Sequence, residues 1–120
     1  MNSLLFVVGT FVILGLLPNY AGANYTCTGP IKGVTVDPLT GNVVPGVISG
    51  ITRPVMCSLE QTRNGVSPNM CKQILAVLLT AQVSGKNVVL WFKDDATGGN
   101  CATHGQWTDL SGWYYGPQME

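Results

Sequence analysis

The residues best suited to chemistry gather in one stretch, Lys93–Trp113, which holds the only histidine of the chain. The candidate ligand-binding residues there are Asp95, Asn100, His104, Trp107 and Trp113. Aromatic rings beside polar side chains are typical of sites that bind sugars or proteins, because the ring stacks while polar groups form hydrogen bonds. A long loop in a small domain is more often functional or disordered than incidental, and Cys101 argues against disorder because a disulfide would attach the loop. We therefore expect a binding surface in this stretch.

Two alternatives concern where that surface lies. The tryptophans of the stretch could instead cover one end of the folded core, as large aromatic residues commonly do. If Trp107 belongs to the core, the turn at Asp37–Asn42 is the next surface to consider. The sequence alone leaves both placements open.

Enzymatic chemistry has little support in this sequence. A nucleophile needs a base within hydrogen-bond reach, and a single loop histidine such as His104 is more often a solvated or hydrogen-bonded residue. The chain has no Gly-x-Ser-x-Gly motif and no glycine-rich phosphate loop. Members of a catalytic triad need not be neighbours in sequence, so a small hydrolase using His104 stays a remote alternative. We expect a non-enzymatic protein with no catalytic residue and no cofactor.

Metal binding is also disfavoured. Asp94 and Asp95 could offer oxygen ligands to calcium together with Thr97 and Asn100, but the spacing lacks the full calcium-loop pattern. A solvated acidic loop is the simpler interpretation. No two cysteines have Cys-x-x-Cys spacing, which argues against a zinc site.

Charge gives a further exclusion. Six basic and six acidic residues leave a formal net charge of zero, with no run of like charge. Nucleic-acid-binding domains and proteins of anionic membrane surfaces carry basic patches. We therefore expect neither nucleic acid nor an anionic membrane surface as a partner.

The amino-terminal segment predicts export. Leu4–Leu17 is almost wholly apolar, carries no charge, and is shorter than the roughly 20 residues that span a membrane. Ala21, Gly22 and Ala23 supply the small-x-small pattern of a signal-peptide cleavage site. We predict a signal peptide over 1–23, cleavage before Asn24, and a secreted single domain over 24–120 that does not span a membrane. An uncleaved anchor is the alternative, because no Lys or Arg precedes the apolar core.

The first half of the predicted domain indicates three strands. Pro30–Val36 and Val43–Ile48 are rich in β-branched residues and flank the turn Asp37–Asn42. Pro45 cannot donate to a strand ladder, so it marks an edge or a bulge. Pro54–Glu60 is the third strand.

The second half contains the clearest element, a helix over Asn69–Val83. Ser67 is a good N-cap, Pro68 suits the first helical position, and Gly85 suits the left-handed residue after the helix. The apolar run Asn87–Phe92 predicts a strand covered on both faces, which places Trp91 in the core. Short aromatic strands follow at 107–109 and 113–115.

This order of elements predicts a mainly β fold with one helix. Five strands with a helix between the third and fourth are the layout of an OB-fold, in which the helix plugs one end of a closed five-stranded barrel. The competing arrangement is a plain antiparallel sheet with one helix packed across it. We favour the OB-fold-like barrel.

Four cysteines in an exported chain predict two disulfides, and three pairings are available. Cys57 ends the third strand and Cys71 lies in the first turn of the helix, points that the barrel brings together. We therefore predict Cys57–Cys71, which leaves Cys27–Cys101 to attach the amino terminus to the loop after the fourth strand.

One part of the chain resembles a known group of proteins. The residues that carry the resemblance are Cys57-Ser58-Leu59, Asn64–Pro68, Cys71-Lys72, Leu78–Ala81, Ser84-Gly85-Lys86, Cys101 and Tyr114-Tyr115. They are similar to small exported proteins and, more distantly, to the receptor-binding B subunits of subtilase-type and typhoid-type bacterial toxins. The resemblance implies an OB barrel, assembly as a homopentamer and binding of cell-surface glycans. It assigns no sugar-binding residue here, because the segment before Cys57 does not align.

The function expected from the sequence is therefore a secreted recognition module that binds a cell-surface glycan or glycoprotein. The alternative is a secreted interaction or defence protein that binds another protein, as an inhibitor does.

Overall fold

The computed structural model describes residues 24–93 and 100–120 of the chain. The predicted signal peptide, 1–23, and the candidate ligand-binding residue Asp95 lie outside these residues. Within the described part of the chain, no helix is long and apolar enough to cross a membrane.

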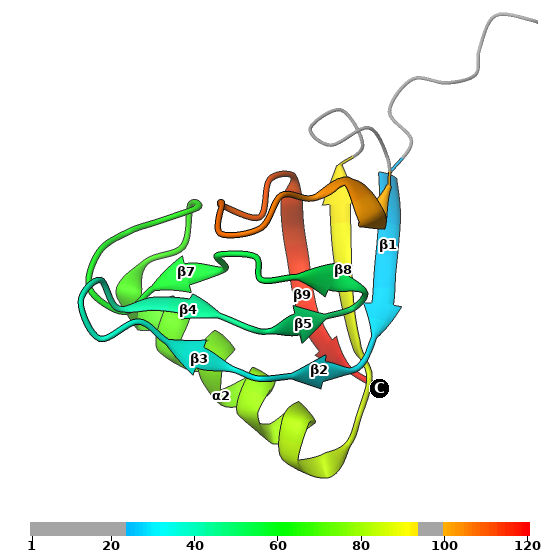
Figure 1. The fold of residues 1–120 in the computed structure, drawn as a ribbon, viewed down its shortest axis with the longest axis horizontal. Coiled ribbons are helices and arrows are strands. Elements are labelled where there is room, and N and C mark those ends of the chain that lie inside the picture. Colours follow the sequence, from blue (N-terminus) through cyan, green and yellow to red (C-terminus); the bar gives the residue numbers. More distant parts are fainter. Residues whose placement is uncertain (1–23, 94–99) are drawn as a thin grey trace, which may run out of the picture.

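The described chain folds into three small antiparallel sheets and one long helix (Figure 1). The strands are β1 (Asn24–Gly29), β2 (Ile31–Lys32), β3 (Thr35–Val36), β4 (Asn42–Val44), β5 (Val47–Ile48), β6 (Ile51–Thr52), β7 (Cys57–Ser58), β8 (Val88–Lys93) and β9 (Trp113–Met119). The helix α2 spans Pro68–Ser84, and a short 3-10 helix, η2, spans Cys101–Thr103. The sheets have the strand orders β1-β8-β9, β2-β5-β6 and β3-β4-β7. A mainly β fold with one helix is thereby confirmed.

The closed five-stranded barrel is wrong, because the predicted strands break in the middle. Gly33 has a φ of +66°, and the Gly46 backbone N–H donates to the carbonyls of both Lys32 and Gly33, at 3.0 and 2.9 Å. Pro45 has no N–H to continue the ladder. The predicted strands Pro30–Val36 and Val43–Ile48 therefore become two short strands each, whereas Pro54–Glu60 contains only β7. The 31–58 segment bends into two sheets whose strands run across the direction of β1, β8 and β9 (Figure 1).

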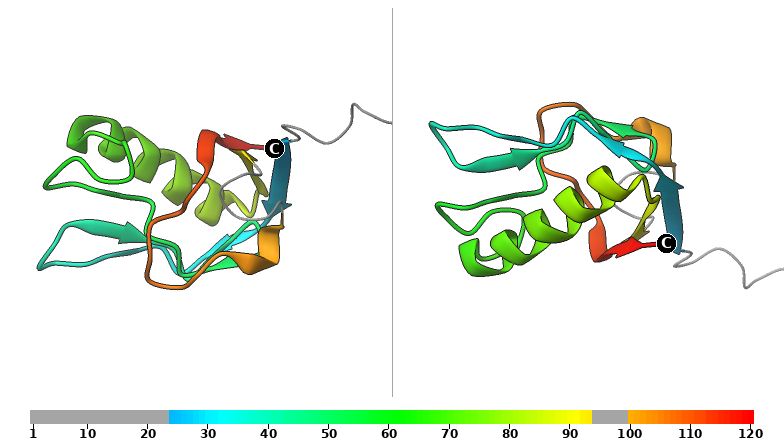
Figure 2. Two further views of the ribbon diagram at one scale, coloured as in Figure 1. Left: turned by 90° about the horizontal axis from the view of Figure 1, so that it is seen from above. Right: turned by 90° about the horizontal axis from the view of Figure 1, so that it is seen from below.

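The helix forms as its local signals predict. The Ser67 hydroxyl accepts from the Met70 N–H at 3.1 Å, Pro68 opens the helix, and Gly85 ends it with a φ of +70°. Figure 2 shows α2 along one side of the molecule, where it contacts β2, β7 and β9. Its buried residues lie on one face and are Cys71, Ile74, Leu78 and Ala81.

The core forms where α2 and β8 meet the β2-β5-β6 and β3-β4-β7 sheets. Phe92 and Leu90 on β8 are fully buried, and Met56 and Leu78 pack into the same cluster. Trp91 is only partly buried, so its predicted place in the core is wrong. Side chains alternate along a strand, which turns Trp91 to the other face, where its ring meets the Tyr115 ring edge-on at 5.1 Å.

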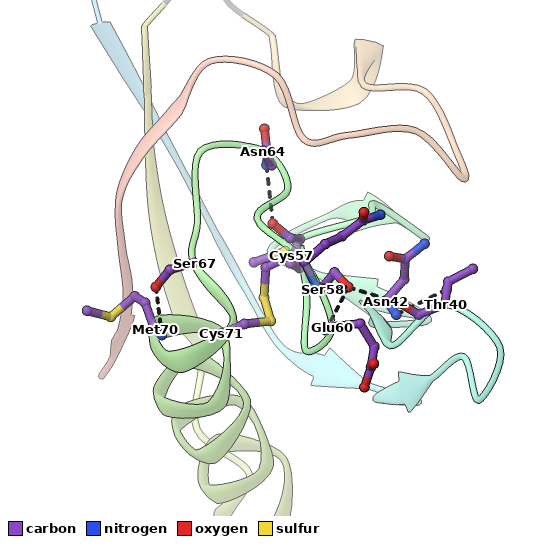
Figure 3. The surroundings of a disulfide bond; sticks show 11 residues. Thr40, Asn42, Cys57, Ser58, Glu60, Asn64, Ser67, Met70 and Cys71 are labelled. Carbon is purple, nitrogen blue, oxygen red and sulfur yellow. Dashed lines mark hydrogen bonds between the residues drawn. A yellow bond between two sulfur atoms is a disulfide. The ribbon is translucent and has the colours of Figure 1, made fainter.

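Both predicted disulfides are confirmed. Figure 3 shows Cys57–Cys71 joining β7 to the first turn of α2, and Cys27–Cys101 joins β1 to η2. The bridges close segments with sequence separations of 14 and 74 residues. In the chain-entropy model they stabilise the fold by about 3 kcal/mol and more than about 4 kcal/mol.

Candidate functional site

The candidate residues predicted from the sequence do not form one cluster. The structure places Asn100 and His104 at η2, beside β1 and β8, whereas Trp107 lies against Arg53 and Trp113 packs against the core. Each has a different role.

His104 packs against the aromatic residues of the β1-β8-β9 sheet. Its Nε2 shares a 3.0 Å hydrogen bond with the Tyr25 hydroxyl, and its ring centroid lies 4.6 Å from that of Phe92. Burial lowers the pKa of the imidazole below its usual value, so His104 is neutral at pH 7. These contacts anchor the segment that Cys101 attaches to β1.

Asn100 is the N-cap of η2. Its side-chain oxygen accepts from the Ala102 N–H at 2.7 Å. This hydrogen bond is local and satisfies an otherwise unpaired helix N–H. The structure therefore gives Asn100 a capping role at η2.

The contacts of His104 predict a pH dependence of stability. Because its folded pKa lies below the unfolded value, its contribution is fully present above about pH 6.5 and is lost as the pH falls. At pH 7.5 His104→Gln should be less stable than the wild type by about 1 kcal/mol, the net value of a typical hydrogen bond. Urea unfolding at pH 7.5, 6 and 5 should show this difference shrinking as the solution becomes acidic. A difference that stays constant would contradict the assignment.

Trp113 covers the edge of the core. It is partly buried, packs against the core cluster, and its indole Nε1–H donates to the Tyr115 carbonyl at 3.1 Å. The alternative in which tryptophans close the core therefore describes Trp113.

Trp107 is exposed and held in place. Its side chain is 64% exposed, and its backbone N–H donates to the Arg53 carbonyl at 2.7 Å. The Arg53 guanidinium lies 5.7 Å from the indole centroid, within cation–π range. Trp107 and Arg53 both have positive φ, +63° and +46° respectively. Non-glycine residues rarely adopt this conformation, which costs about 1 kcal/mol or more and is concentrated at functional sites.

Beside Trp107 lies a cavity of about 520 Å³, here named the Trp107 cavity. Its lining residues are Thr35, Val36, Asp37, Pro38, Asn42, Val44, Gly46, Arg53, Val55, Arg63 and Trp107. The volume falls within the range of about 300–1,000 Å³ typical of small-molecule sites. The cavity thus unites the two surfaces that the sequence left as alternatives, Trp107 and the Asp37–Asn42 turn.

Asn42 gives the Trp107 cavity a specific chemical property. On β4 the Val43 side chain points into the core, and its neighbours Asn42 and Val44 line the cavity. Asn42 is only 9% exposed, and its Oδ1 is buried without a hydrogen-bond partner among the described residues. Figure 3 shows it beside Ser58, its partner on β7. An unpaired buried polar atom costs about 1–3 kcal/mol, and this carboxamide oxygen is such an acceptor in a residue that lines the cavity.

The charged residues of the cavity are fixed by short contacts. Asp37 Oδ1 accepts from the Leu39 N–H at 2.9 Å, and backbone hydrogen bonding of this kind lowers the pKa of the carboxyl group. Arg63 Nε donates to Asp109 Oδ1 at 2.7 Å. The guanidinium of Arg53 lies over the Trp107 ring, 5.7 Å from its centroid. The cavity therefore presents an aromatic ring, cationic donors and a carboxylate acceptor around a buried amide.

Sequence reasoning missed Arg53 and Arg63, and it included Asn42 only as the last residue of the Asp37–Asn42 turn. Asn42 is the polar residue that begins β4, ahead of Val43 and Val44, and was a weak signal because the rest of β4 is apolar. Nothing local marked Arg53 or Arg63. Among the described residues, no group of three or more His, Cys, Asp or Glu could hold a metal ion.

No family model, no curated protein and no solved structure matches this chain. The function is therefore inferred from the site itself.

Proposed function

We propose that this chain is a secreted, non-enzymatic recognition module that binds a glycan of the cell surface, free or on a glycoprotein, in the Trp107 cavity. The single observation that carries the proposal concerns Asn42, which lines that cavity: its Oδ1 is buried and has no hydrogen-bond partner among the described residues. A sugar hydroxyl is a suitable donor to a carboxamide oxygen, because it can both donate and accept.

The other lining groups suit a saccharide as well. The exposed indole of Trp107 offers an apolar ring face for stacking, while Arg53 and Asp37 supply a donor and an acceptor. An aromatic ring with a few fixed polar groups is the usual composition of a small-molecule site.

The proposal includes an OB-like origin of the fold. The helix lies between the regions of the predicted third and fourth strands, Pro54–Glu60 and Asn87–Phe92. A parallel bridge from Val55 to Asp109 brings the first of these two regions beside the carboxyl-terminal part of the chain. These features support an open relative of the OB-fold, similar to the toxin B subunits. A homopentamer is the assembly that this relation implies.

A second candidate is a secreted interaction or defence protein whose ligand is another protein. The observation in its favour is Leu39, which is 92% exposed at the turn beside the cavity. A projecting apolar side chain on a turn fits a protein pocket better than a sugar.

Asn42→Leu is the variant that tests the proposal. Leucine has nearly the same shape and removes the unpaired amide, so the free energy of unfolding should stay the same or rise by about 1 kcal/mol. Binding to a printed glycan array should nevertheless fall at least tenfold, because the acceptor is lost. Urea unfolding and array titration of the wild type and the variant measure both quantities.

Two results would refute the glycan proposal. A blank array for the wild type would favour the protein-binding alternative, especially if Leu39→Ala then weakens capture of a protein partner. Unchanged array binding by Asn42→Leu would show that glycans bind elsewhere.

A further inference from the structure

We propose that Asn64 is a positioning residue for the Trp107 cavity, holding Trp107 in its binding position without touching the ligand. This inference rests on the proposed function, because it assigns how that site keeps its shape. Asn64 is not among the residues that line the cavity; it faces a separate groove with Val66, Ile74 and Trp113.

The side chain of Asn64 connects two segments of the main chain. Its Nδ2 donates to the Met56 carbonyl at 3.3 Å and to the Leu110 carbonyl at 3.2 Å. Figure 3 shows the amide directed toward the chain just before Cys57. One amide group thus attaches the carboxyl-terminal segment to the strand segment that forms the cavity wall.

The segment attached in this way carries Trp107. Three backbone hydrogen bonds join it to residues 53–55: from Trp107 N–H to the Arg53 carbonyl, from Val55 N–H to the Thr108 carbonyl and from Leu110 N–H to the Val55 carbonyl, at 2.7, 2.9 and 3.1 Å. The Arg63–Asp109 ion pair adds a side-chain contact. The Asn64 amide donates to the carbonyl of Leu110, the last residue of this short ladder, so losing the amide weakens the attachment at the Leu110 end.

The backbone of Asn64 explains why this residue type suits the position. Its φ is +56°, a left-handed conformation that asparagine tolerates better than most residues. Asparagine also brings a two-proton donor, which serves both carbonyls. Glycine shares the backbone freedom and lacks the donor, so Asn64→Gly removes the two hydrogen bonds without adding strain.

Opening of the 107–110 segment would lower affinity by reducing the fraction of molecules that can bind. In Asn64→Gly, hydrogen-exchange protection of the Val55, Trp107 and Leu110 amides should fall about tenfold relative to wild type, as expected for roughly 1.4 kcal/mol of lost contacts. Protection of the β8 amides should stay unchanged. Titration on the same glycan array should show a loss of affinity of up to tenfold.

Asn100→Gly is the matched control, since it also removes an amide that caps backbone, but at η2 and away from the cavity. It should leave array binding and the three amides unchanged. Equal loss of protection in β8 would show a merely structural role for Asn64 and overturn the inference, as would unchanged affinity despite lost protection. A blank wild-type array would overturn the proposed function, while the exchange data would still decide whether Asn64 holds the segment.

Discussion

Trp107→Ala should lower glycan affinity about 30-fold or more while leaving the melting temperature almost unchanged. A tryptophan at the centre of a binding site commonly contributes at least about 2 kcal/mol, which corresponds to that factor. The indole is 64% exposed in the free protein, so its removal takes little from the core. Array titration and thermal unfolding measure the two effects.

Tyr115→Ala is the control for this experiment. Tyr115 is 62% exposed, nearly as much as Trp107, but lies on the β1-β8-β9 sheet outside the cavity lining. Its removal should leave binding intact. If Tyr115→Ala weakens binding as much as Trp107→Ala does, the glycan binds on the sheet and the cavity is not the site.

Phe92→Ala should destabilise the fold by about 3–5 kcal/mol, the usual cost of truncating a buried large aromatic residue. Phe92 is fully buried and stacks on Tyr25 at a centroid distance of 5.1 Å. Trp91→Ala should cost only about 1 kcal/mol, because Trp91 is partly exposed and loses mainly its aromatic contact with Tyr115.

Urea unfolding of the two variants compares these residues directly. Neighbouring positions on one strand should differ by at least about 2 kcal/mol, since their side chains lie on opposite faces. Equal losses would show that both faces of β8 are equally important to the core.

Local signals predicted the helix and the disulfides well. Ser67, Pro68 and Gly85 act through contacts within a few residues, so the sequence determines the ends of α2 directly. The Cys57–Cys71 bridge follows from the same local order, a strand end followed by a helix start.

The sheets were harder to predict because their shape depends on contacts between segments. The Gly46 N–H bonds to Lys32 and Gly33, a pairing that no residue pattern within either strand announces. β1 was missed because its sequence, NYTCTG, is polar on the exposed face and contributes only Cys27 and Gly29 as buried residues. Its alternation was a signal, but a short one.

The proposed binding site was predicted in part. Exposure of Trp107 and the importance of the Asp37–Asn42 turn were both anticipated, yet as alternatives. The two surfaces meet in one cavity because of Arg53. Its carbonyl accepts a hydrogen bond from the Trp107 N–H, and its backbone is left-handed. His104 and Asn100 are residue types that are common in binding sites. Their hydrogen-bond partners, Tyr25 and Ala102, instead give them structural roles.

Mapping the bound glycan by NMR tests the central claim most directly. The glycan with the strongest array signal is titrated into ¹⁵N-labelled protein, and shifted amides are placed on the structure. Binding in the Trp107 cavity predicts shifts concentrated at Asp37, Asn42, Arg53 and Trp107, including the Trp107 indole N–H. Shifts confined to the outer face around Trp91 and Tyr115, with the cavity amides unmoved, would contradict the account.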